Sequence, residues 1–203
     1  SCGERYRAVG GRARRSRAPE TVGQTGPMAV ICVFCGSSSG TDPVFAETAG
    51  ELGAALAHAG HELVYGGGHV GLMGVVADAA LAHGGTVTGV MTEQLVAAEI
   101  AHTGLTRLEI TASMHARKAR MAELSEAVIV LPGGFGTLDE TFEIVTWNQL
   151  GLVSVPVVFL DVAGYFAPLF EFVERSVVAG FVSGRHGRLI RRSGDVDGAI
   201  AHA

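Results

Sequence analysis

Lysine is nearly absent from this chain, in which Lys118 is the single lysine among 203 residues. An enzyme that uses pyridoxal phosphate needs a lysine for the Schiff base, so only Lys118 is available for that chemistry. Long hydrophobic runs are missing too, since the longest apolar stretches are far shorter than a membrane span. The histidines are scattered and form no group with metal-ligand spacing. We therefore expect no membrane-spanning helix, no metal and no bound cofactor.

Cysteine is scarce, with three residues in the whole chain. Cys32 and Cys35 form a C-x-x-C pattern, which in other contexts indicates redox or metal chemistry. Both lie in an apolar run over 29–35 that predicts a strand, in which positions i and i+3 face opposite sides. We therefore expect two buried thiols that do not pair with each other, as in a protein of the reducing cytoplasm.

Basic residues are sparse outside the N-terminal segment. Residues 1–27 carry six arginines and two acids, whereas residues 28–203 carry nine basic and eighteen acidic side chains. An acidic body argues against nucleic acid as a partner. The arginine-rich segment has little apolar periodicity, so we expect a disordered extension over 1–27, one folded domain over 28–203, and Met28 as the native start.

The body alternates between short apolar runs and amphipathic stretches of helical period. We expect strands at 29–35, 61–65, 86–91, 105–110, 127–131, 155–160 and 188–190. We expect helices at 43–59, 71–83, 113–124, 137–149, 165–179 and 195–202, with a short one within 92–103. This alternation predicts an α/β fold: a single Rossmann-like domain with a doubly wound parallel sheet and helices on both faces. Right-handed crossovers would bring the loops at 35–39, 66–71 and 132–137 to one edge of the sheet.

The stretch from 131 to 151 begins with a glycine loop. The loop follows the apolar strand at 127–131 and has no Cβ at Gly133, Gly134 and Gly136, and a helical pattern opens at Thr137. Backbone N–H groups can approach a ligand closely in such a loop, and the start of a helix attracts an anion. The stretch therefore predicts a site for a phosphate-bearing ligand.

Two features of the sequence are also consistent with different roles. Thr137 and Glu140 stand three residues apart, as in a capping box. Under this alternative, Glu140 caps the helix and has no catalytic role, and the glycine loop only connects a strand to a helix. A second loop, Gly66 to Gly71, matches the pattern G-x-G-x-x-G. With Glu93 as the acidic ribose ligand, that loop would indicate a dinucleotide oxidoreductase.

The predicted helix at 113–124 holds three of the nine basic residues of the body. Met114, Arg117, Arg120 and Met121 have the spacing of one helix face, and Lys118 is adjacent. Arg120 could belong to a solvated basic patch. In an otherwise acidic body, however, three cations within four residues indicate an anion site.

Taken together, the motifs of this chain resemble those of the LONELY GUY family of cytokinin-activating phosphoribohydrolases, often labelled lysine decarboxylase-like. The resemblance covers about 29–191. The segments that carry it are Tyr65-Gly-Gly-Gly-x-Val-Gly-Leu-Met-Gly74, Glu99-Ile-Ala-His-x-Gly-Leu105, Met114-His-x-Arg-Lys118, Pro132-Gly-Gly-x-Gly-Thr-x-x-Glu140 and Thr146-Trp-x-Gln-Leu-Gly151. It implies hydrolysis of the N-glycosidic bond of a nucleoside 5′-monophosphate, in which N6-substituted adenosine monophosphates yield a free base and ribose 5-phosphate.

The same resemblance assigns residues to roles. Arg117 and Glu140 match the catalytic pair of the family. The positions expected to bind substrate or its phosphate are Glu99, Lys118, Gly133, Gly134, Phe135, Gly136, Thr137, Leu138, Asp139 and Thr146, with Gly67, Gly68 and Met114 as further candidates. The resemblance also implies a homodimer or a larger homo-oligomer.

The residues agree with that chemistry. Cleavage of a ribosyl C1′–N bond passes through an oxocarbenium-like state, which a carboxylate stabilises while it activates water, and Glu140 fits this role. A planar guanidinium such as that of Arg117 suits the phosphate or the developing charge. Two other classes stay open: a nucleotide or molybdenum-cofactor carrier of the same fold, and the dinucleotide oxidoreductase. A pyridoxal-dependent decarboxylase would have to rely on Lys118.

Overall fold

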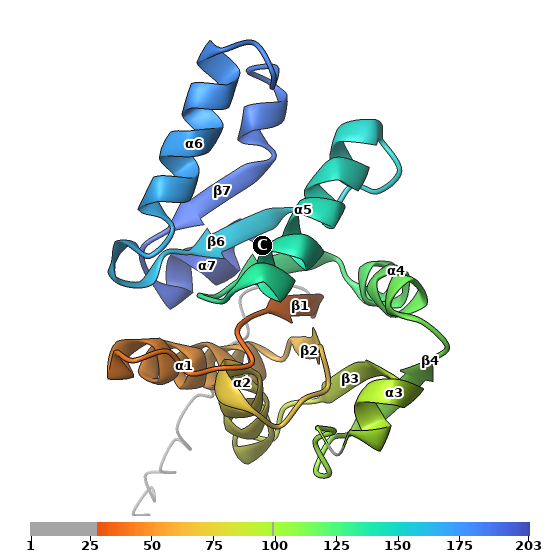
Figure 1. Ribbon diagram of the computed structural model, residues 1–203. Helices are drawn as coiled ribbons and strands as arrows, with labels where there is room; N and C mark the ends of the chain where they lie inside the picture. Colours follow the sequence, from red (N-terminus) through yellow and green to blue (C-terminus); the bar gives the residue numbers. More distant parts are fainter. Residues whose placement is uncertain (1–27, 99) are drawn as a thin grey trace, which may run out of the picture.

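The computed structural model describes residues 28–98 and 100–203. These residues form a seven-stranded sheet in the order β4-β3-β2-β1-β5-β6-β7, and every neighbouring pair of strands is parallel (Figure 1). The strands are β1 Val30–Phe34, β2 Glu62–Tyr65, β3 Val87–Thr92, β4 Arg107–Thr111, β5 Ala127–Val130, β6 Val157–Leu160 and β7 Ile190–Ser193. The central strands are apolar at nearly every position because both faces of the sheet are covered.

Helices follow the strands, as the sequence pattern predicts. The α-helices are α1 Pro43–Ala59, α2 Gly71–Ala82, α3 Glu93–Ala97, α4 Met114–Leu124, α5 Phe135–Leu150, α6 Ala167–Val178 and α7 Val196–His202. Two 3₁₀ turns, η1 Val162–Gly164 and η2 His186–Arg188, precede α6 and β7. Local chemistry sets several boundaries: Asp42 caps α1, Ser113 caps α4, and Gly60 ends α1 in the left-handed conformation.

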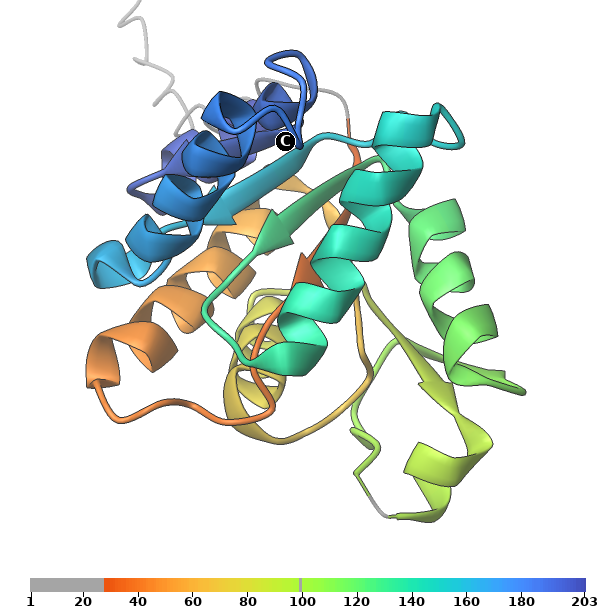
Figure 2. The same ribbon diagram turned by 45° about the horizontal axis from the view of Figure 1, so that its top comes forward.

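Helices cover both faces of the sheet (Figure 2), and each face has its own hydrophobic core. One core packs α1, α2 and α7 against the sheet, and the other packs α4, α5 and α6. Cys35 belongs to the first core and Cys32 to the second, so the expectation of two unpaired buried thiols is confirmed. Burial raises the pKa of both thiols, because a thiolate is poorly solvated there.

The strand order reverses at β1. From β1 the chain moves outward through β2 and β3 to β4, and it then returns to place β5 on the other side of β1. The loops after β1 and β5 therefore diverge, which opens a crevice at the carboxyl ends of these two strands. The predicted meeting of loops 35–39, 66–71 and 132–137 at one edge is confirmed, because residues of all three line one cavity.

Some boundaries differ from the sequence-based expectation. Helix α5 begins at Phe135 rather than at Thr137. The last strand is at Ile190–Ser193 rather than at 188–190, because a 3₁₀ turn ends only at Arg188. Among the described residues, no helix has the length and apolar character needed to cross a bilayer. The expectations for residues 1–27 and for Glu99 fall outside the described residues.

Candidate active site

The candidate site is a cavity of about 430 Å³ at the switch point between β1 and β5. Its walls come from the ends of β1, β2 and β5 and from the first turns of α4 and α5. The lining residues are Val33, Cys35, Gly36, Ser37, Gly66, Met73, Met114, Arg117, Gly134, Phe135, Gly136, Thr137 and Glu140. Both members of the predicted catalytic pair and most of the predicted glycine loop thus meet in one cavity.

The N-terminus of α5 is open toward this cavity. Gly134 is the N-cap residue, and no side chain caps the helix. Thr137 is buried inside the first turn, and its carbonyl accepts a hydrogen bond of 2.6 Å from the Thr141 hydroxyl. The predicted capping box of Thr137 and Glu140 is therefore wrong. The first N–H groups of α5 have no intrahelical partner and lie where an anion could accept from them.

The glycines of the loop serve different purposes. A Cβ on Gly133 would lie 2.1 Å from the Thr137 hydroxyl and 2.8 Å from the backbone nitrogen of Gly36, so this position needs glycine for close packing. A Cβ on Gly134 or Gly136 would meet nothing within 4 Å. Those two glycines leave space beside the helix start, which is what a bound ligand would occupy.

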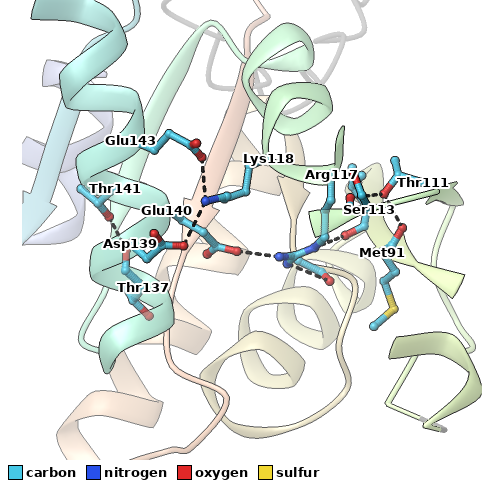
Figure 3. A network of polar contacts seen from close by, with 12 residues as sticks. Met91, Thr111, Ser113, Arg117, Lys118, Thr137, Asp139, Glu140, Thr141 and Glu143 are labelled. Carbon is cyan, nitrogen blue, oxygen red and sulfur yellow. Dashed lines mark hydrogen bonds and ion pairs between the residues drawn. The ribbon is translucent and has the colours of Figure 1, made fainter. Parts of the chain in front are cut away.

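Arg117 is buried and fixed on three sides (Figure 3). Its Nε donates to the carbonyl of Val90 at 2.8 Å, Nη2 donates to the carbonyl of Gly66 at 3.4 Å, and Nη1 donates to Oε1 of Glu140 at 2.7 Å. A Cβ on Gly66 would stand 2.5 Å from Nη2. The absence of a side chain at Gly66 therefore makes room for the guanidinium.

Glu140 lies on the second turn of α5, facing Arg117 on α4. Its side chain is only 14% exposed. Burial raises the pKa of the Glu140 carboxyl, and the charge and hydrogen bond of Arg117 oppose that rise. A buried carboxylate with a raised pKa, facing a cavity, has the properties of a general base or acid.

Lys118 points to the carboxylates of α5 rather than into the cavity (Figure 3). Its ammonium lies 3.1 Å from Asp139 and 2.9 Å from Glu143. The hydrogen bond with Glu143, followed by that with Asp139, raises the pKa of Lys118. Lys118 thus links α4 to α5, and the substrate contacts expected of Lys118 and Asp139 stay predictions.

The other residues of α4 divide as follows. Met114 is exposed at the mouth of the cavity, and Met121 is buried in the core. Arg120 leaves the predicted face and pairs with Glu109 of β4 at 2.7 Å and with Glu123 at 3.3 Å. The predicted shared face therefore holds for Met114, Arg117 and Met121. The side chain of Arg120 turns away from that face because it pairs with the carboxylate of Glu109 on the neighbouring strand.

The loop from Gly66 to Gly71 is a packing device. Gly67 adopts a positive φ and contacts Met91, and a Cβ on Gly68 would collide with Met73. A Cβ on Gly71 would lie 2.3 Å from the backbone of Ser37. Neither Gly67 nor Gly68 lines the cavity, and the first N–H group of α2 beyond Gly71 donates to the Gly36 carbonyl at 3.0 Å. The glycines of this pattern allow close packing, and the substrate contacts expected of Gly67 and Gly68 stay predictions.

Several further expectations can be placed. Phe135 lines the cavity and is 95% exposed. Leu138 is half-buried against the second core, and Thr146 is exposed, with its hydroxyl bonded to the carbonyl of Phe142 on the same helix. Sequence reasoning missed Ser37, in the loop after β1, and Met73, in the first turn of α2, which both line the cavity. The Ser-rich turn after β1 was the available signal for the first.

Comparison with known proteins identifies the family of this chain. A family described as "Possible lysine decarboxylase" matches residues 73–203. The cytokinin riboside 5′-monophosphate phosphoribohydrolase of Rhodococcoides fascians is 45% identical over 172 residues, which cover 84% of this chain and 87% of that protein. An Arabidopsis thaliana protein of the same name is 47% identical over 161 residues, covering 79% of this chain and 74% of that protein.

The chain belongs to the LONELY GUY family. Among solved structures, the molybdenum cofactor carrier protein of Chlamydomonas reinhardtii superposes with a TM-score of 0.66 at 25% identity, covering 86% of this chain and 95% of that one. The molybdenum cofactor binding protein of Rippkaea orientalis has a TM-score of 0.63 at 20% identity, with 86% of this chain and 94% of that one covered. The LONELY GUY chain thus shares its fold with proteins of other stated functions.

Proposed function

We propose that this protein hydrolyses the N-glycosidic bond of N6-substituted adenosine 5′-monophosphates and releases the free base and ribose 5-phosphate. The observation that carries the proposal is the buried Arg117–Glu140 pair, which lies in the same cavity as the uncapped start of α5. The names of relatives with 42–47% identity support the substrate class.

The start of α5 suits the 5′-phosphate. Its orphan N–H groups and the positive end of the helix dipole act together, and Gly134 and Gly136 leave the approach open. With the phosphate there, the ribose would extend toward the second turn of α5. Glu140 stands on that turn, so its carboxylate is placed to reach the reacting C1′ atom.

Glu140 supplies the chemistry in this proposal. Its carboxylate stabilises the oxocarbenium-like state at C1′ and accepts a proton from the attacking water. The water oxygen forms the new bond to C1′ while the C1′–N bond breaks. The electron pair of the broken bond stays on the base nitrogen, which takes up one proton. The water supplies both the oxygen and the proton, so the reaction consumes no cofactor.

Arg117 acts on Glu140 rather than on the phosphate. Its guanidinium already donates to two backbone carbonyls and to Oε1 of Glu140. These bonds hold the carboxylate in one orientation and favour its ionised form. We assign the activated water to Oε2, the oxygen that Arg117 does not bind.

The other activities fit less well. A Schiff-base lysine must be a neutral amine at the reacting carbonyl, but Lys118 lies between two carboxylates that raise its pKa, and it does not line the cavity. The residues present therefore do not fit pyridoxal phosphate. A carrier function is also less well supported. The sequence is 25% identical to that of the molybdenum cofactor carrier protein and 45% identical to that of a phosphoribohydrolase.

The test is chromatography of incubations with AMP and with N6-isopentenyl-AMP, with Glu140→Gln as the control. Glutamine keeps the shape and an acceptor for Arg117 but cannot take a proton. We expect free base from the wild type and a loss of about 10²- to 10⁴-fold in the variant. Binding of both nucleotides without release of base from either would reject the hydrolase in favour of a carrier.

We also propose that the protein forms a homodimer or a larger homo-oligomer. Helix α6 has no fully buried residue, and its end carries Val178, 89% exposed, followed by Phe181, 90% exposed. Phe172 on the same helix is also exposed. Large apolar side chains exposed on one helix and just beyond its end favour a surface that a second chain covers.

A further inference from the structure

Tyr165 contacts the glycine loop from a distant part of the chain. It follows η1 and precedes α6, and its hydroxyl donates a 2.7 Å hydrogen bond to the carbonyl of Gly133. Its ring packs edge-on against Phe45 at the start of α1, with centroids 5.7 Å apart, and against Phe166 at 5.0 Å. These contacts fix the hydroxyl over the loop.

The hydrogen bond sets the direction of one peptide group. A trans peptide is planar, and its C=O and N–H point in opposite directions. Because the carbonyl of Gly133 turns toward Tyr165, the N–H of Gly134 turns the other way. Gly134 is the N-cap of α5 and lines the candidate active site, so this N–H belongs to the proposed phosphate site.

The Gly133–Gly134 peptide depends on a side-chain hydrogen bond to keep its orientation. It joins two glycines, so rotation of the whole peptide meets little steric resistance. The preceding carbonyl, that of Pro132, is already held by the backbone N–H of Gly36 at 3.0 Å. For the carbonyl of Gly133, the partner is the Tyr165 side chain. A rotated peptide would aim a carbonyl oxygen at the anion.

The turn before Tyr165 carries a backbone feature that agrees with a positioning role. Ala163 has φ of +52°, the one positive φ of a non-glycine residue in the described part of the chain. A left-handed alanine costs about 1–3 kcal/mol and persists only where its surroundings enforce it. A second cavity of about 280 Å³ lies between Tyr165 and the loop after β1.

We propose that Tyr165 is a positioning residue that holds the Gly133–Gly134 peptide with its N–H toward the phosphate of the substrate. The inference rests on the proposed function, because it needs a phosphate at the start of α5. It concerns binding of the anion and not the cleavage step. Its loss should therefore weaken phosphate recognition and leave Glu140 unaffected.

The test compares Tyr165→Phe with the wild type. The ring is kept, so the aromatic contacts remain and the variant should fold with a similar melting temperature. A neutral hydrogen bond corresponds to a change of up to about 10-fold in an equilibrium constant. We expect the inhibition constant of inorganic phosphate and the KM for N6-isopentenyl-AMP to rise by about 3- to 10-fold, with kcat within about twofold. The inhibition constant of N6-isopentenyladenosine, which has no phosphate, should not change.

Ser176→Ala is the matched control. It also removes a hydrogen bond from a hydroxyl to a backbone carbonyl, the 2.9 Å bond from Ser176 to Phe172 within α6, which lies away from the glycine loop. An unchanged phosphate inhibition constant in Tyr165→Phe, or an equal effect on the nucleoside, would overturn the inference. Calorimetry with inorganic phosphate separates the two proposals. If the wild type binds phosphate and Tyr165→Phe binds it more weakly, the inference stands even where no base is released.

Discussion

Arg117 and Glu140 form a buried ion pair, and such a pair is seldom kept for stability alone. Removing two charges from water costs several kcal/mol per ion, and mutual attraction together with other hydrogen bonds only offsets that cost. Here Arg117 donates to two backbone carbonyls in addition to Glu140. The carboxylate keeps one oxygen for other partners at the edge of a cavity, which is the arrangement a catalytic base requires.

The raised pKa of Glu140 predicts the pH dependence of turnover. Burial raises this pKa above the ordinary value of 4.5, and the active form is the ionised one. The acidic limb of kcat/KM should therefore have its midpoint above 4.5. Stability changes in the opposite sense: the contribution of the protonated carboxyl is complete below the unfolded pKa and is lost as pH rises through the folded pKa. A pH–rate profile with a midpoint at or below 4.5 would contradict the role of Glu140.

Arg117→Met tests whether this arginine acts through Glu140. The charge of Arg117 lowers the pKa of Glu140, so its removal should move the acidic limb of kcat/KM to higher pH and reduce kcat. An arginine that instead bound the phosphate would give mainly a higher KM and an unmoved limb. Steady-state kinetics across pH distinguishes these outcomes. Arg120→Met, which breaks only the pairs with Glu109 and Glu123, is the control.

The start of α5 combines packing and binding within four residues. Gly133 packs against Thr137 and the loop after β1, while Gly134 and Gly136 border open space. One short motif therefore does two separable things. It fixes the helix start to the sheet edge, and it leaves the first N–H groups accessible.

Two alanine substitutions should separate these roles. Gly133→Ala forces a Cβ into the Thr137 hydroxyl and should destabilise the protein by about 1–3 kcal/mol. Gly136→Ala meets no atom and replaces a helical glycine, so it should stabilise by about 0.5–1 kcal/mol yet narrow the cavity and raise KM. Denaturant unfolding and steady-state kinetics measure both effects. Equal stability changes in the two variants would contradict the division.

The arrangement of the whole sheet places the site. The reversal of strand order at β1 brings together loops that are about 30 or more residues apart along the chain (Figures 1 and 2). Helix α4 contributes Arg117 to the same cavity. Helix α6 lies on the same face as α4 and α5 and leaves part of its apolar surface exposed. That surface is the basis for the proposed self-association.

Phe172→Glu tests where the chains meet. A charge on the exposed side of α6 would be buried without a partner in an interface, so the oligomer should dissociate or shrink. Light scattering after size exclusion gives the mass. Ile110→Glu is the control, since Ile110 is also exposed but lies on β4, at the far edge of the sheet. An unchanged mass for Phe172→Glu, or a change only for Ile110→Glu, would place the interface elsewhere.

The pattern of residues along the chain was sufficient for the fold class and the order of the elements. Strands buried on both faces must be apolar, helices must carry an apolar stripe, and parallel connections have one hand, so these features are visible locally. The opposite orientations of Cys32 and Cys35 follow from the same two-residue period. The family resemblance was needed to predict that Arg117 and Glu140 lie together beside the glycine loop.

Only the folded structure decided which groups pair. Lys118 and Arg120 look alike in the sequence as cations near an anion site, yet each binds carboxylates from another element. Thr137 and Glu140 have capping spacing, but Arg117 binds the carboxylate, and the missing side chain of Gly66 makes room for that arginine. Such choices depend on distances between residues far apart in the chain. The local sequence does not determine these partners, because the competing side chains come close to one another only when the sheet has formed.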